Sequence, residues 1–118
     1  MSVQVNPVQV EEEIRRVSDD ISTGVAVCDQ TYRAFLAADR TYDAAFARAY
    51  MAHGGAAHER KYAAELETGR EREMRDVADA AYRYADRRAK ALQDELRALQ
   101  SVGASMRAMF AVAGVGER

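Results

Sequence analysis

Apolar residues recur at alternating steps of three and four along two long stretches of this chain. The first stripe runs from Val10 to Ala49 and the second from Met74 to Ala113. Such spacing places side chains on one face of an α-helix. The 118 residues include one proline and many alanines, and proline breaks helices whereas alanine loses no side-chain entropy in them. We therefore expect an all-α protein.

The first helix is expected at residues 6–52. Asn6 and Pro7 are suited to open it, because an Asn side chain accepts hydrogen bonds from free amides and proline tolerates the first helical position. The Ser-Thr-Gly tract at 22–24 coincides with a doubled step of four in the first stripe. We expect a bend or a short break there.

Two further helices are expected after the first. Paired glycines at 54–55 end the first helix. A short connecting helix is expected at 56–68 and a long one at 69–113, which Thr68 and Glu71 open at the spacing of a capping box. The chain is then a single elongated helical domain, with two long helices folded as an antiparallel hairpin.

A hairpin of two long helices has little core for its length, so we expect copies to assemble through coiled-coil-like seams. Gly103 lies on the second stripe, where a glycine costs about 1 kcal/mol relative to alanine and so suggests a close neighbouring backbone. The alternative is a bend or helix end near residue 102. The expected oligomer interface comprises Leu92, Leu96, Leu99, Gly103, Met106 and Phe110.

Two charged residues interrupt the apolar stripes, Asp39 in the first and Arg88 in the second. If the long helices fold back about a turn between residues 54 and 69, these two positions lie level. The sequence thus predicts an ion pair inside the apolar interface, which would penalise shifted registers. Alternatively, both side chains lie at the edge of the interface and reach water.

The chain offers no pattern typical of an enzyme or a metal site. Cys28, the single cysteine, is expected to be a small core residue, and His53 and His58 to be solvated residues beside the turn. No metal-binding or phosphate-loop spacing is present, and the carboxylates are typical of solvated helix faces. We expect no catalytic residues, no metal and no cofactor.

Neither a signal peptide nor a membrane span is expected. The N-terminus lacks a basic start followed by an apolar run, and no stretch approaches the roughly 20 apolar residues that cross a bilayer.

Basic side chains gather towards the C-terminus. Residues 83–118 hold seven basic and four acidic side chains, and two tyrosines, Tyr82 and Tyr84, lie close by. A basic helix face with aromatic neighbours can follow a single nucleic-acid strand. The interleaved Asp86 and Asp94 also allow an ordinary solvated face of mixed charge. The basic face comprises Arg83, Arg87, Lys90 and Arg97, and Arg88, which interrupts the apolar stripe, is also a candidate for nucleic-acid binding.

Several features occur in an order that resembles a known family. Tyrosines lie in the first helix, Arg60-Lys61 precedes a glycine-containing turn, and Ser101-Val102-Gly103 is followed by Met106-Arg107-Ala108. This order resembles the UvsY-type recombination mediators of T-even phages, which are small helical phage proteins. Unlike that family, the segment before the turn at Gly69 is acidic.

The resemblance implies a homo-oligomer that binds single-stranded DNA and helps to load a recombinase onto strands coated by single-strand-binding protein. Lys61 matches the family's basic segment, and residues 106–114 match the helix used in assembly. The recombinase and the single-strand-binding protein are the implied partners. The implied location is the cytoplasm of an infected bacterial host.

Two other functions are open from the sequence. Tyr82 and Asp86 have the Tyr-x-x-x-Asp spacing of the small helical hairpins exported by type VII secretion, although the Trp-x-Gly turn of that group is absent. A structural or adaptor protein without nucleic-acid binding is the other alternative.

Overall fold

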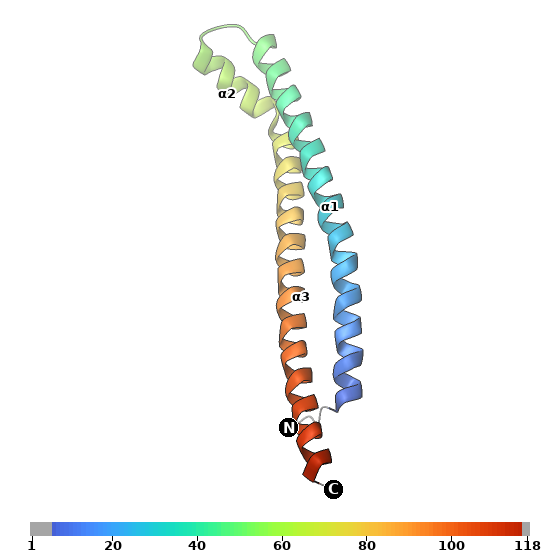
Figure 1. Cartoon of the computed structure of the whole chain (residues 1–118). Helices are drawn as coiled ribbons and strands as arrows, with labels where there is room; N and C mark the ends of the chain where they lie inside the picture. Colours follow the sequence, from blue (N-terminus) through green and yellow to red (C-terminus); the bar gives the residue numbers. More distant parts are fainter. Residues whose placement is uncertain (1–5, 117–118) are drawn as a thin grey trace. The chain divides into compact units, whose positions relative to one another are not determined.

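The structure, a computed structural model, describes residues 6–116 of the chain, and their side chains through residue 113. It contains three helices, α1 (Pro7–Ala52), α2 (Ala57–Glu67) and α3 (Gly69–Gly116), and the described part has no strand (Figure 1). The predicted all-α hairpin is confirmed, because α1 packs against α3 and the short α2 connects them.

The start of α1 is fixed by a reciprocal pair of hydrogen bonds. The Gln9 amide donates to Asn6 Oδ1 at 2.9 Å, and the Asn6 amide donates to Gln9 Oε1 at 3.2 Å. The predicted cap at Asn6 is confirmed. Gln9 completes a capping box at the standard spacing of three, a pattern that the sequence also contains.

The predicted break in the first helix is wrong, because α1 runs without interruption through Gly24. A single glycine costs about 1 kcal/mol in a helix interior, which a helix of 46 residues absorbs through its other hydrogen bonds. At the other end, α1 stops at Ala52 and Gly55 has a positive φ of 102°, as the paired glycines predicted.

Thr68 joins α2 to α3 without a loop, but it does not form the predicted capping box. Its amide and its hydroxyl both donate to the Ala64 carbonyl, at 3.1 and 2.7 Å. The amide is therefore unable to bind the Glu71 carboxylate, whose Oε2 atom is buried without a hydrogen bond to any described residue. The Thr68 carbonyl accepts instead from the Arg72 amide at 3.1 Å, which continues the helical pattern into α3.

The chain divides into two compact units, and α1 and α3 each contribute to both. The first unit comprises Met1–Ala26 with Arg87–Arg118, and the second comprises Val27–Asp86. The core is thin in each. The buried apolar residues of the described chain are Val10, Val17 and Leu92 in the first unit, and Ala49, Ala64 and Ala85 in the second.

In the first unit, most of the predicted oligomer interface faces α1 of the same chain. Leu92 is 3% exposed, and Leu96, Leu99 and Met106 are half-buried. Gly103 is buried, and a Cβ atom there would lie 3.4 Å from Val10 Cγ1 and 3.9 Å from Ile14 Cδ1. The close neighbours of Gly103 are thus side chains, two from α1 and that of Arg107 at 3.7 Å from α3 itself, whereas the sequence suggested a backbone. Phe110, at 60% exposed, is the member turned to solvent.

In the second unit, α2 packs beside the end of α1. Arg60 Nε donates to the Tyr50 carbonyl at 3.2 Å, and the Arg60 guanidinium lies 4.7 Å from the centre of the Tyr50 ring. His53 Nε2 lies 2.8 Å from Glu67 Oε2, so this histidine has a partner that the sequence analysis did not identify. Ala45 and Ala49 of α1 line a pocket together with Thr68 and Glu71, so the start of α3 lies beside α1 residues before the end of α1.

This placement of α2 changes the register of the hairpin and makes the predicted Asp39–Arg88 pair wrong. Asp39 Oδ1 lies 3.9 Å from Arg75 Nη1, and the Arg75 guanidinium covers the Tyr42 ring at 4.5 Å. Arg88 is exposed, and the buried side of α3 passes from Ala85 through the half-buried Ala89. The next residue after Ala85 on the buried side is Ala89, four positions on, whereas the sequence analysis placed Arg88, three positions on, in the apolar stripe.

Substitutions at Leu92, which is 3% exposed, and at Leu66, which is 86% exposed, test how much the thin core contributes to the stability of the fold. Leu92→Ala should lower the free energy of unfolding by about 2–5 kcal/mol, because it removes a buried side chain and leaves a cavity. Leu66→Ala, at a residue 86% exposed, should change it by less than about 0.5 kcal/mol. Urea unfolding followed by circular dichroism measures both, and equal losses would contradict the assigned core.

Glycines 24 and 103 provide a matched test of the contact between α1 and α3. Gly103→Leu should destabilise the fold by about 1–3 kcal/mol, because its side chain meets Val10 and Ile14. Gly24→Leu should not, since nothing lies within 4 Å of a Cβ atom there and leucine favours helix. Thermal melts compare the two variants, and similar melting temperatures would show that Gly103 does not face α1.

Candidate nucleic-acid interface

All six predicted nucleic-acid-binding side chains are exposed, but the structure does not place them in one unit. Lys61 on α2 and Arg83 on α3 belong to the second unit. Arg87, Arg88, Lys90 and Arg97 lie on α3 in the first unit. Arg88 is nine residues from Arg97, which is 2.5 turns and so the opposite side of the helix, and the other three form the part of the predicted interface that can be described as one surface.

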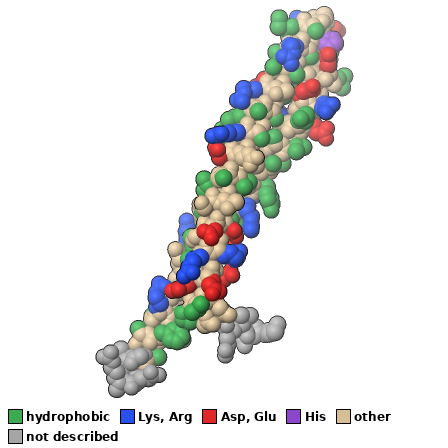
Figure 2. Space-filling view, turned by 90° about the vertical axis from the view of Figure 1, so that its right-hand side faces the viewer, with side chains coloured by type: hydrophobic (Ala, Val, Ile, Leu, Met, Phe, Trp, Pro, Cys, Tyr) green, Lys and Arg blue, Asp and Glu red, His purple; other side chains and the backbone are tan. Residues whose placement is uncertain are grey.

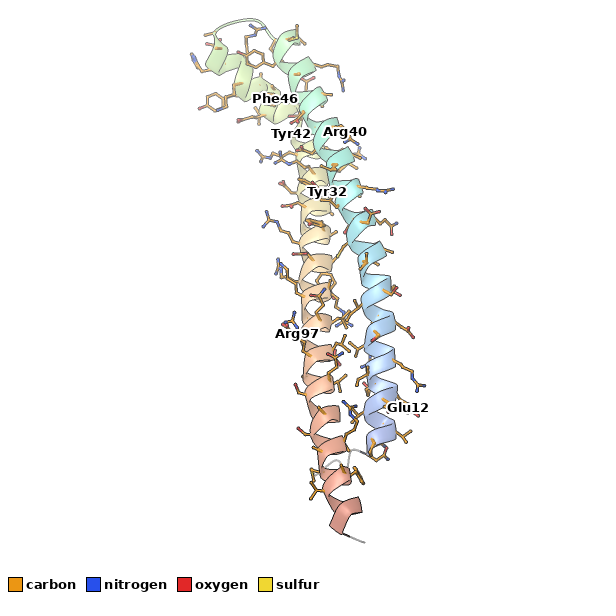
Figure 3. All side chains as sticks on the ribbon, in the orientation of Figure 1. Glu12, Tyr32, Arg40, Tyr42, Phe46 and Arg97 are labelled. Atoms are coloured by element: carbon orange, nitrogen blue, oxygen red, sulfur yellow. The ribbon has the colours of Figure 1, made fainter. Side chains whose placement is uncertain are left out.

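In the first unit, the basic face of α3 is turned away from α1. Arg97 projects to the side opposite α1 (Figure 3), and Leu92 is buried on the inner side. Lys90 shares the side of Arg97, because its offset of seven residues is close to two turns of 3.6, and Arg87, five residues before the buried Leu92, lies about 140° around the helix from it. These side chains are therefore accessible to an anionic partner along one face.

Acidic residues accompany the basic ones along α3. Arg97 Nη1 lies 3.4 Å from Asp94 Oδ1, and Arg83 Nε lies 3.1 Å from Asp79 Oδ2. On the face seen in Figure 2, Lys and Arg side chains are interleaved with Asp and Glu. A nucleic-acid strand would compete with these local pairs, which are exposed and so contribute little stability.

Arg16 of α1 is the centre of an ion-pair network that reaches α3. Its Nη2 atom lies 2.7 Å from Glu13 Oε2 and 3.4 Å from Glu95 Oε1, and its Nη1 atom lies 3.3 Å from Asp20 Oδ2. The hydrogen bond with Arg16 lowers the pKa of the Glu13 carboxyl, and the same bond raises the pKa of Arg16. The sequence analysis missed this network because Arg16 and Glu95 are 79 residues apart.

The two tyrosines beside the basic face differ in exposure. The Tyr82 ring is half-buried and packs against Tyr32 with 5.0 Å between ring centres, so it serves the contact between α3 and α1. Tyr84 is 70% exposed and offers a ring on which a base can stack. Tyr82, the tyrosine of the Tyr-x-x-x-Asp spacing, thus contributes to the packing of α3 against α1.

The apolar end of α3 adds a second accessible surface to the first unit. Met109 and Val112 are 71% and 73% exposed, and with Ala108 and Ala113 they line an open groove. This groove lies on α3 beyond the buried Gly103, towards the C-terminal end of the helix. Polar and apolar surfaces thus follow each other along one helix.

The described residues show no arrangement typical of a metal site. No group of three or more His, Cys, Asp and Glu side chains among them could hold a metal ion. Cys28 is half-buried, and none of the described helices is long and apolar enough to span a bilayer.

Comparisons of the chain with protein-family models, with curated proteins and with solved structures found no match.

Proposed function

We propose that this chain is a non-enzymatic helical protein that associates with itself and binds single-stranded nucleic acid along the basic face of α3. The observation that carries the proposal is the exposure of Arg87, Lys90 and Arg97 on the side of α3 turned away from α1. Basic side chains on such a face bind phosphates and release their counterions.

Self-association is supported by the apolar surface that the described residues leave exposed. Large apolar side chains near the end of α3 are exposed, among them Met109, Phe110 and Val112. Burial of such side chains against another copy would be favourable.

The resemblance to UvsY-type mediators adds a specific role to this proposal. In that role, the oligomer holds single-stranded DNA and assists the loading of a recombinase onto strands coated by single-strand-binding protein. An adaptor function without nucleic acid is the second candidate. It is favoured by the pairing of Arg97 with Asp94 and of Arg83 with Asp79, which partly neutralises the basic face.

Binding to a fluorescein-labelled oligothymidine, followed by fluorescence anisotropy over a range of salt concentrations, tests the proposal. The unmodified chain should bind at low salt and release the strand as salt rises. Arg87→Gln combined with Lys90→Gln should weaken binding and reduce the slope of log affinity against log salt by about 1.4, because two phosphate contacts are lost.

Arg33→Gln combined with Arg40→Gln is the matched control, since it removes two exposed charges from α1 in the second unit. This control should keep the slope of the unmodified chain. No anisotropy change with the unmodified chain at low salt would reject nucleic-acid binding and leave the adaptor function.

A further inference from the structure

In the first unit, the outward sides of α1 and α3 carry charged side chains of matching spacing. Glu12, Arg15 and Asp19 follow each other on α1 at steps of three and four, and Lys90, Asp94 and Arg97 on α3 at steps of four and three. All six are exposed. Glu12 and Arg97 point away from the opposite helix (Figure 3), so the two sets cannot meet within one chain.

The signs of these charges are complementary when the two sets are aligned antiparallel. One alignment places Glu12 opposite Arg97, Arg15 opposite Asp94, and Asp19 opposite Lys90. All three positions then join opposite charges. Because positions three and four residues apart share a helix face, the three pairs lie along a single line of contact.

Neighbouring alignments bring like charges together. A shift of three residues places Arg15 opposite Arg97 in one direction, or Glu12 opposite Asp94 in the other. A shift of four residues places Asp19 opposite Asp94, or Arg15 opposite Lys90. Like charges at close quarters disfavour each of these registers, so the charge pattern selects one alignment among its neighbours.

We propose that a second copy of this chain docks here, with the outward side of its α3 antiparallel to the outward side of α1 in the first copy. The ion pairs Glu12–Arg97, Arg15–Asp94 and Asp19–Lys90 set the register. This inference adds to the proposed self-association a charged docking surface, separate from the exposed apolar side chains near the end of α3. The two docking surfaces differ, so each copy can bind a neighbour on either side, and the assembly is a closed ring or an open filament.

Docking and strand binding use the same side of α3, because Lys90 and Arg97 belong to both surfaces. A bound strand therefore competes with a docked copy, and an oligomer holds a strand only through a copy whose α3 face is undocked. This competition rests on the proposed nucleic-acid binding, whereas the docking itself does not.

Charge reversal on each surface, alone and in mixture, tests the docking by sedimentation velocity. Glu12→Lys with Asp19→Lys makes both surfaces basic, and Lys90→Glu with Arg97→Glu makes both acidic. Each variant alone should associate about tenfold more weakly than the unmodified chain, or worse, because attraction becomes repulsion. An equimolar mixture of the two should regain association, since each variant then meets the opposite charge.

Asp43→Lys with Glu73→Lys is the control, because it changes the net charge equally at exposed residues of the second unit. It should associate like the unmodified chain, and circular dichroism should show every variant equally helical. Association of both reversed variants at the unmodified level, a mixture that stays dissociated, or an unmodified chain that is monomeric at all concentrations would each overturn the proposal.

Oligothymidine binding by the same variants separates this inference from the proposed function. Glu12→Lys with Asp19→Lys leaves the basic face of α3 intact, so it should bind the strand at least as tightly as the unmodified chain while losing association. If the mixture of the two reversed variants regains association but the unmodified chain binds no strand, the docking is supported and nucleic-acid binding is rejected.

Discussion

The contact between the apolar sides of α1 and α3 is the constraint on which the arrangement of every exposed group depends. In the first unit this contact is made by Val10, Val17, Leu92 and the buried Gly103. A helix that buries one side must present the opposite side to solvent. The burial of Leu92 therefore determines that Arg97 and its neighbours face outward, and the burial of Val17 does the same for Glu12.

Much of the local structure could be predicted from the sequence. The capping residue Asn6, the paired glycines and the apolar stripes gave helix bounds within about three residues of those observed, because caps and periodicity are local properties of the chain. The register of the hairpin was not predictable in this way. It depends on how α2 lies against α1, and the bond between Arg60 and the Tyr50 carbonyl that fixes this placement has no sequence signature.

The predicted interface residues show a related limit. An apolar stripe such as that from Leu92 to Gly103 is stable only when it is buried against another surface. The sequence does not show whether that surface belongs to the same chain or to another copy. In the structure, Val10 and Ile14 of α1 supply it. The basic face was predicted to be exposed, since charge and periodicity suffice for that, but Arg88 was predicted inside the apolar interface and is exposed. The pairing of the basic face with Asp79 and Asp94 follows from helical spacings of four and three residues, whereas the link from Arg16 to Glu95 required the fold.

A cysteine pair at positions 10 and 103 tests most directly whether α1 packs on α3 of the same chain. The variant carries Val10→Cys and Gly103→Cys, together with Cys28→Ser to remove the native thiol. Val10 Cγ1 lies 3.4 Å from the position of a Cβ atom at residue 103, so the two introduced thiols lie close to each other. Mild oxidation should close a disulfide within one chain, seen as a monomer of faster mobility on a non-reducing denaturing gel. Formation of disulfide-linked dimers, with little of that fast monomer, would show that the partner of the α3 stripe is another copy and would contradict the account.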